Sequence, residues 1–154
     1  MKKGIFVFLI LFISLPLYAE FSKGKIGVDV NYPGLGVRYF FTDKISAELK
    51  GQFEKDIGVY GLRGYYYFKP GEKLSLLSGL ECDYVSFEGD ESEGSGFAVE
   101  LFVGGEYFFA KNISLQMDMG PAFIALNDKD TDESVGGVEY VVNIGINYYF
   151  GKGR

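Results

Sequence analysis

Four aromatic triplets, each at the end of a strand-like run, decide the fold of this chain: Tyr39-Phe40-Phe41, Tyr66-Tyr67-Phe68, Tyr107-Phe108-Phe109 and Tyr148-Tyr149-Phe150. Three of them are followed by a short turn and then a hydrophobe-Ser pair: Ile45-Ser46, Leu74-Ser75 and Ile113-Ser114. Tyr and Phe side chains are favoured at the headgroup level of a membrane. The triplets therefore predict an aromatic rim at one end of a closed sheet, formed by Tyr39, Phe41, Tyr66, Phe68, Tyr107, Phe109, Tyr148 and Phe150.

Between the triplets the sequence alternates with a period of two, which is typical of β-strands. In residues 45–54, for example, Leu49 and Phe53 fall on an apolar face, whereas Glu48 and Lys50 fall on a polar one. The same division recurs in seven further segments, roughly 25–32, 35–41, 58–68, 74–87, 97–109, 113–126 and 137–150. The pattern predicts an all-β fold, an eight-stranded antiparallel up-and-down transmembrane β-barrel.

The connections between the predicted strands differ at the two ends of the sheet. Those after the triplets are short, whereas two on the other side, at 88–96 and 127–136, are long, acidic and rich in Gly and Ser. Short turns at one rim and longer loops at the other are the layout of outer-membrane barrels. An even number of antiparallel strands also brings the last strand beside the first, so that the sheet can close.

The first residues are interpreted as a secretory signal peptide that is not part of the fold. Lys2 and Lys3 supply a positive region, residues 5–13 are apolar, and Ala19 offers a small residue for cleavage. The apolar run is too short to cross a membrane as a helix. We therefore expect a signal peptide at 1–19, a barrel domain at 20–154, and export to the outer membrane.

Composition excludes several functions. The formal charge of −6 becomes −8 once the two lysines of 1–19 are removed, so binding to nucleic acid is not expected. A single cysteine permits no internal disulfide. The chain contains no histidine, so a Ser-His-Asp or Cys-His arrangement cannot be built. We expect a protein that is not an enzyme.

Alternation alone does not say which face of the sheet looks outward. A soluble periplasmic barrel of the lipocalin type would bury the apolar face around a small hydrophobic ligand. The inverted arrangement is favoured because the apolar face carries the aromatic rim. The polar face is also rich in small residues, as a narrow lumen requires: Gly27, Gly36, Gly104, Gly120 and Gly145.

The chain resembles the small eight-stranded outer-membrane barrels, the OmpA- and OmpX-like group of porin-family proteins. The resemblance covers residues 20–154 and is most specific in the terminal strand 137–150. There, alternating hydrophobes leading to Phe150 are similar to the signal read by the barrel-assembly machinery, although four residues follow Phe150. The resemblance implies that machinery as a partner during biogenesis, with outer-membrane lipids and lipopolysaccharide as partners afterwards.

With the polar face inward, the short turns set an approximate register between the charged residues. It predicts a ladder of alternating charge across four neighbouring strands, Arg38–Glu48–Arg63–Glu81, with Glu81 diagonal to Arg63. Such pairs would plug the lumen. The lumen also contains an excess of acids: Asp83, Glu100, Glu106, Asp118 and Glu139. A narrow pore that favours cations is therefore an alternative.

One acidic segment resembles a calcium-binding loop. Asp128, Asp130 and Asp132 alternate, and Glu139 follows at the spacing of the last EF-hand ligand. Glu133 stands where an EF-hand needs glycine, and strands rather than helices flank the segment. We expect no resident cofactor, with weak binding of Ca²⁺ or Mg²⁺ as the sharper hypothesis. The same acids could bridge through divalent ions to lipopolysaccharide phosphates.

Overall fold

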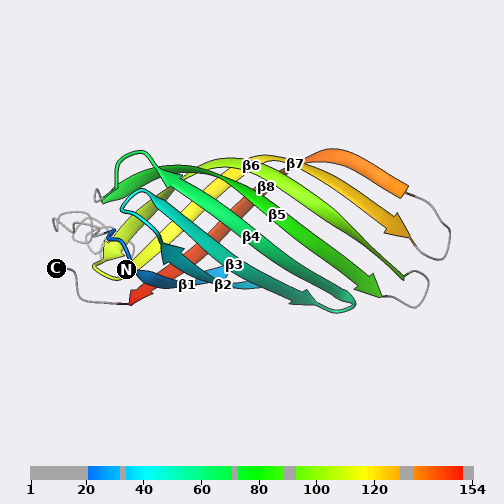
Figure 1. Ribbon diagram of the computed structural model, residues 1–154, viewed down its shortest axis with the longest axis horizontal. Coiled ribbons are helices and arrows are strands. Elements are labelled where there is room, and N and C mark those ends of the chain that lie inside the picture. Colours follow the sequence, from blue (N-terminus) through cyan, green and yellow to red (C-terminus); the bar gives the residue numbers. More distant parts are fainter. Residues whose placement is uncertain (1–20, 32–33, 71–72, 89–92, 129–133, 151–154) are drawn as a thin grey trace, which may run out of the picture.

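All eight strands join in one closed antiparallel sheet, in which each strand pairs with its neighbours in sequence and β8 returns to β1 (Figure 1). The computed structural model describes residues 21–31, 34–70, 73–88, 93–128 and 134–150. The predicted eight-stranded barrel is therefore confirmed. The strands are β1 (Ile26–Asn31), β2 (Gly34–Phe40), β3 (Ile45–Glu54), β4 (Ile57–Tyr67), β5 (Leu74–Glu88), β6 (Glu93–Ala110), β7 (Ile113–Asp128) and β8 (Ser134–Phe150).

Strand length divides the barrel into two halves. β1 and β2 have 6 and 7 residues, whereas β5 to β8 have 15 to 18. Figure 1 shows that β5–β8 continue well beyond the ends of β1 and β2, whereas β4 reaches nearly as far as β5, since Ile57 pairs with Phe87. The expectation of long loops over all of 88–96 and 127–136 is wrong. Both segments include paired strand residues, since Gly94 pairs with Phe87 and Ser134 pairs with Asn127. Of the Gly, Ser and acidic residues that suggested loops, the described ones at 93–96 and 134–136 belong to the strands of two protruding hairpins.

The apolar face of the sheet points outward. Leu49 and Leu101 are 68% and 61% exposed, whereas Glu48 and Arg63 are 1% and 0% exposed. The expected inverted orientation is thus what the barrel has, and a sheet with this outer surface does not enclose an apolar ligand cavity of the lipocalin type. Within the described residues, no helix is both long and apolar enough to cross a membrane.

The aromatic triplets serve both faces of the sheet. Their first and third residues point outward, as expected for a rim, with Tyr39, Phe41, Tyr66, Phe68, Tyr148 and Phe150 exposed and Tyr107 and Phe109 half-buried. Their middle residues point inward and are buried, which the sequence analysis did not foresee: Phe40, Tyr67, Phe108 and Tyr149. Alternation requires this, because consecutive residues in a strand face opposite sides.

Phe21 closes the barrel at this aromatic end. Its ring centroid lies 5.0 Å from that of Phe40, 4.5 Å from Tyr67, 5.3 Å from Phe108 and 6.1 Å from Tyr149. The chain is held there by backbone bonds, including the one from the Gly24 N–H to the Phe40 carbonyl (2.8 Å). The five rings therefore form an aromatic floor, in which the middle residue of every triplet packs on one residue from before β1.

Interior glycines leave room for large polar side chains. A Cβ on Gly36 would meet the Glu48 carboxylate, with its Cδ 2.9 Å away, and a Cβ on Gly27 would meet the ring of Tyr149 at 2.6 Å. Gly27 is paired with Tyr149 across the β1–β8 ladder, and Gly36 lies on β2, next to the strand β3 that carries Glu48. Small residues on the polar face are thus paired with large ones, as the expected narrow lumen requires.

We predict that Phe21→Ala lowers the free energy of unfolding by about 3 kcal/mol, because it removes the ring on which the floor packs. Phe97→Ala is the matched control, since Phe97 points outward, and it should cost about 1 kcal/mol or less. Urea unfolding in phospholipid vesicles, followed by circular dichroism, measures both. Equal losses in the two variants would contradict a packing role for Phe21.

Candidate functional site: the polar interior

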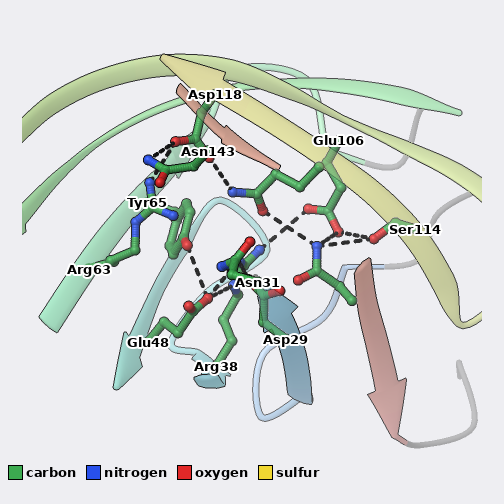
Figure 2. Close-up of polar contacts among 12 residues, drawn as sticks. Asp29, Asn31, Arg38, Glu48, Arg63, Tyr65, Glu106, Ser114, Asp118 and Asn143 are labelled. Atoms are coloured by element: carbon green, nitrogen blue, oxygen red, sulfur yellow. Dashed lines mark hydrogen bonds and ion pairs between the residues drawn. The ribbon is translucent and has the colours of Figure 1, made fainter. Parts of the chain in front are cut away.

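Arg38 is the centre of the part of the interior that adjoins the aromatic floor, since its guanidinium contacts Tyr67 and Tyr149. Figure 2 shows it beside Glu48 and Asp29. Its Nε and Nη2 donate to the Glu48 Oε2, at 2.8 and 2.6 Å. Its Nη1 donates to the hydroxyl oxygens of Tyr67 (2.8 Å) and Tyr149 (3.1 Å), and its Nη2 lies 3.4 Å from the Asp29 Oδ2. Every nitrogen of this buried guanidinium therefore has a partner, as a buried charge requires.

Glu106 balances Arg38 from the other side of the lumen. The Tyr67 hydroxyl donates to its Oε2 at 2.7 Å, and the Tyr149 hydroxyl donates to its Oε1 at 2.6 Å. Asn147 Nδ2 (3.0 Å) and the Ser114 hydroxyl donate to the same Oε1. Because the two tyrosine hydroxyls accept from Arg38 and donate to Glu106, they connect opposite charges across the barrel.

A second cluster lies around Arg63 in the upper half of the interior. Its Nε lies 2.6 Å from the Glu81 Oε2, and its Nη2 donates to the Asp118 Oδ1 at 2.7 Å. Lys50 reaches the same Glu81 through an ion pair and lies 3.7 Å from the Asp83 carboxylate. Asp118 comes from β7, so this cluster also joins strands that are not neighbours in the sheet.

Tyr65 separates the two arginines. The Arg38 guanidinium lies 3.9 Å from the centroid of its ring, and that of Arg63 lies 5.3 Å from the same centroid. The Tyr65 hydroxyl donates to the Glu48 Oε2 at 3.0 Å. A ring between two guanidinium groups is favoured by cation–π attraction. The two clusters are thus held at a fixed spacing by one aromatic side chain.

Amides complete the connection between the clusters on the β7–β8 side. Gln116 Nε2 donates to the Asp118 Oδ2 at 2.7 Å. Asn143 Nδ2 donates to the Asp118 Oδ1 at 3.1 Å and to the Glu100 Oε2 at 3.2 Å. Among the described residues, Glu100 is therefore hydrogen-bonded to a neutral amide, whereas Glu48, Glu81 and Asp118 each have an arginine.

The four residues of the predicted ladder occupy facing positions on β2, β3, β4 and β5. The register pairs Arg38 with Glu48, Glu48 with Arg63, and Arg63 with Glu81. Glu81 is directly opposite Arg63 rather than diagonal to it, which corrects the register counted from the turns. Ion pairs join Arg38 to Glu48 and Arg63 to Glu81. Among the described residues no ion pair joins Glu48 to Arg63; Glu48 instead accepts a hydrogen bond from the Tyr65 hydroxyl.

The interior carries more acids than bases. Among the described residues, seven carboxylates lie inside the barrel wall, those of Asp29, Glu48, Glu81, Asp83, Glu100, Glu106 and Asp118. The cations among the described interior residues are Arg38, Lys50 and Arg63, with Lys25 at the aromatic end. Glu139, which was expected in the lumen, lies on the inward face of β8 but is exposed, because it is near the protruding end.

A second ring of aromatic residues surrounds the outside of the barrel toward the protruding hairpins. It consists of Phe53, Tyr60, Tyr84, Phe97, Phe123 and Tyr140, all exposed. On β6, Phe97 and Phe109 are about 12 residues apart, or about 28 Å along the axis at a tilt of about 45°. The apolar band of an outer-membrane barrel is about 25 Å tall. Sequence reasoning missed this ring because its members are single aromatics rather than triplets.

The predicted metal ligands are only partly described. Asp130 and Asp132 lie outside the described residues, as do residues 1–19 of the expected signal peptide. Asp128 is at the end of the β7–β8 hairpin, whereas Glu139 pairs with Ala122 in the body of that hairpin. Asp128 and Glu139 therefore do not lie side by side, and the described residues contain no group of three or more potential ligands.

An apolar outer band and an internal network of paired charges define an inside-out eight-stranded barrel. The structure is similar to the crystal structure of the N-terminal β-barrel domain of OprF from Pseudomonas aeruginosa, with a TM-score of 0.53 and 16% sequence identity. The match covers 82% of this chain and 94% of that domain. At this identity the likeness concerns the fold. No family model matches the sequence, and no curated protein matches it.

We predict strong coupling between Arg38 and Glu48 in a double-mutant cycle with Arg38→Met and Glu48→Gln. Glu48→Gln alone should cost about 3–5 kcal/mol, because it leaves Arg38 short of a buried charged partner. The coupling energy should be about 1–3 kcal/mol. Unfolding in urea gives each value. The cycle of Glu48→Gln with Arg63→Met is the control and should couple more weakly; the reverse order would contradict the observed partners.

Proposed function

We propose that this protein is an integral outer-membrane β-barrel with a structural or surface-interaction role and without enzymatic activity. One observation carries the proposal: an outward apolar band lies between two aromatic rings, while the charged side chains face inward. In lipid, a backbone can span only as helices or as a closed barrel, and a closed barrel leaves no unpaired edge. The predicted signal peptide supplies the route of export.

The polar interior is proposed to plug the barrel. An eight-stranded barrel is just wide enough for its own side chains to fill. Here the arginines, their carboxylate partners and the tyrosines between them occupy the lumen, and the aromatic floor with Phe21 closes one end. The absence of histidine from the sequence supports a role without catalysis. The buried carboxylates contact arginines, Lys50, amides or hydroxyl groups of the barrel itself.

The protruding hairpins are proposed as the interacting surface. They place Glu88, Glu93 and Asp128 beyond the upper aromatic ring. An acidic rim next to lipopolysaccharide would favour divalent ions that bridge carboxylates and phosphates, and this is where Ca²⁺ or Mg²⁺ is proposed to act. The barrel-assembly machinery remains the proposed partner for insertion.

A narrow cation-favouring pore is the second candidate function. It is favoured by the excess of carboxylates in the interior and by the Oδ1 atoms of Asp29 and Asp83, which lack a hydrogen-bond partner among the described residues. A lumen lined by such oxygens attracts cations and repels anions.

We predict that the folded protein fractionates with membranes and migrates anomalously on a detergent gel unless it is boiled, because a closed hydrogen-bonded barrel resists detergent. The readout is the mobility of unboiled against boiled samples from membrane and periplasmic fractions. Recovery in the periplasmic extract with unchanged mobility would favour the soluble alternative and contradict the proposal.

We predict that any current through the barrel in planar bilayers is carried by cations. Asp83→Asn combined with Glu100→Gln should reduce that preference, because both carboxylates face the lumen. Glu88→Gln is the control, since Glu88 lies at the tip of the β5–β6 hairpin. Reversal potentials in a salt gradient measure the effect, and an anion-selective current would contradict the charge argument.

A further inference from the structure

The wall of the barrel extends the shortest distance from the aromatic end at β1 and β2. A strand that crosses a membrane needs about 9–11 residues, but β1 has 6 and β2 has 7. Starting from the aromatic end, β1 stops at Asn31, opposite Gly145 of β8, and β2 begins at Gly34, opposite Gln52 of β3. Above these pairs the wall has a gap, bounded by β8 on one side and by the end of β3 on the other.

The gap leaves a long free edge on β8. Residues 145–150 pair with β1, but among the described parts of the chain residues 134–144 pair only with β7. The Tyr149 N–H donates to the Asn112 carbonyl on the β7 side (2.8 Å). Since N–H groups alternate sides along a strand, those of Tyr140 and Val142 point into the gap.

Part of this edge lies at the depth of the apolar band. Tyr140 belongs to the upper aromatic ring, and Val142 and Ile144 are exposed on the outer surface below it. Unpaired backbone groups are costly in lipid, and open sheet edges are not found exposed to the hydrocarbon region. An acyl chain cannot satisfy them, because it has neither donors nor acceptors. The edge therefore requires a polypeptide partner.

Symmetry argues against a second copy of the chain. Two copies in one membrane are related by an axis along the membrane normal, which places their β8 edges parallel with identical residues facing each other. N–H groups then face N–H groups, whereas a ladder needs each donor opposite an acceptor. A strand of another polypeptide that runs antiparallel to β8, in the direction of β1, satisfies the edge.

The side chains around the gap indicate the chemistry of that strand. A hollow of about 680 Å³ lies beside the described ends of β1, β2 and β3 and is lined by Val30, Leu35, Phe53 and Glu54, among others. Glu54 and Glu139 lie on the inward faces of β3 and β8, both are exposed, and neither is in an ion pair among the described residues. On the outer surface the gap is flanked by Phe53 and Val142.

We propose that the free edge of β8, residues 134–143, binds an extended segment of another polypeptide as an added antiparallel strand with alternating apolar and basic residues. Its apolar side chains face the lipid beside Val142, and its basic side chains face Glu139 and Glu54. Its backbone pairs with the N–H groups of Tyr140 and Val142. The proposal rests on the proposed membrane barrel and gives its surface-interaction role a defined site.

The test measures binding of a labelled peptide of about 11 alternating Val and Lys residues to the full chain in phosphatidylcholine nanodiscs, by fluorescence anisotropy. Empty discs correct for lipid binding, and an alternating Val/Glu peptide is the charge control. The gel-mobility assay shows separately whether each variant is inserted and folded. A wild-type chain that fails that assay overturns the proposed membrane barrel, whereas a folded barrel that fails to bind overturns only the added strand.

Two pairs of variants separate the backbone from the charge. Val142→Pro should weaken binding of the Val/Lys peptide about tenfold, because it removes one edge N–H, whereas Val142→Ala keeps that N–H and should bind like wild type. Glu139→Lys should weaken binding of the Val/Lys peptide and strengthen that of the Val/Glu peptide. The control Glu88→Lys should do neither.

Three outcomes would overturn the proposal. The first is binding to discs with protein no stronger than to empty discs. The second is equal binding by wild type and Glu139→Lys, which decides the matter even where Val142→Pro does not fold. The third is a dimer crosslinked through a cysteine introduced by Tyr140→Cys in a Cys82→Ser background, which would assign the edge to a second copy.

Discussion

The structure depends on satisfying buried polar groups inside a cylinder that is only eight strands wide. Turning the apolar face outward places every second residue of each strand in a confined interior. Arginines, acids and amides there have little water to rely on, so each must find a partner in the protein. Arg38 illustrates the solution, since Glu48, Asp29, Tyr67 and Tyr149 surround its guanidinium.

This constraint explains why tyrosines rather than phenylalanines occupy two of the four inward triplet positions. Tyr67 and Tyr149 pack in the aromatic floor with their rings and connect Arg38 to Glu106 with their hydroxyls. Phe40 and Phe108 contribute only their rings. The floor and the charge network are therefore one continuous structure, in which the same two residues pack in the floor and hydrogen-bond to the charged residues next to it.

The barrel is closed unevenly. The β1–β8 seam joins 6 residues of β1 to β8, whereas the β5–β6 and β7–β8 ladders run along nearly the whole length of their strands. Closure thus removes the free edges of the sheet near the aromatic floor but not higher up. The long hairpins that project on the other side carry the acids of the rim, so the asymmetry in strand length sets both the exposed edge and the exposed surface.

The strand count, the division of each strand into an apolar and a polar face, and the placement of Arg38 opposite Glu48 could be predicted from the sequence. These are local properties, because side-chain alternation has a period of two and a short turn fixes the register between consecutive strands. The same turns placed Glu81 near Arg63 but did not determine which residue of β5 lies directly opposite Arg63. The length of the β5–β8 hairpins was underestimated, because their Gly- and acid-rich ends also have the composition of loops.

Only the tertiary structure decided which residues meet across the lumen. The Asp118 carboxylate accepts a hydrogen bond from Arg63, and the Glu106 carboxylate accepts hydrogen bonds from Tyr67 and Tyr149. In each case the two residues lie on strands that are not neighbours in the sheet. Such contacts depend on the stagger and diameter of the closed barrel, to which all eight strands contribute at once. The free edge of β8 also depends on the tertiary structure, because it exists only where β8 extends beyond the ends of β1, β2 and β3.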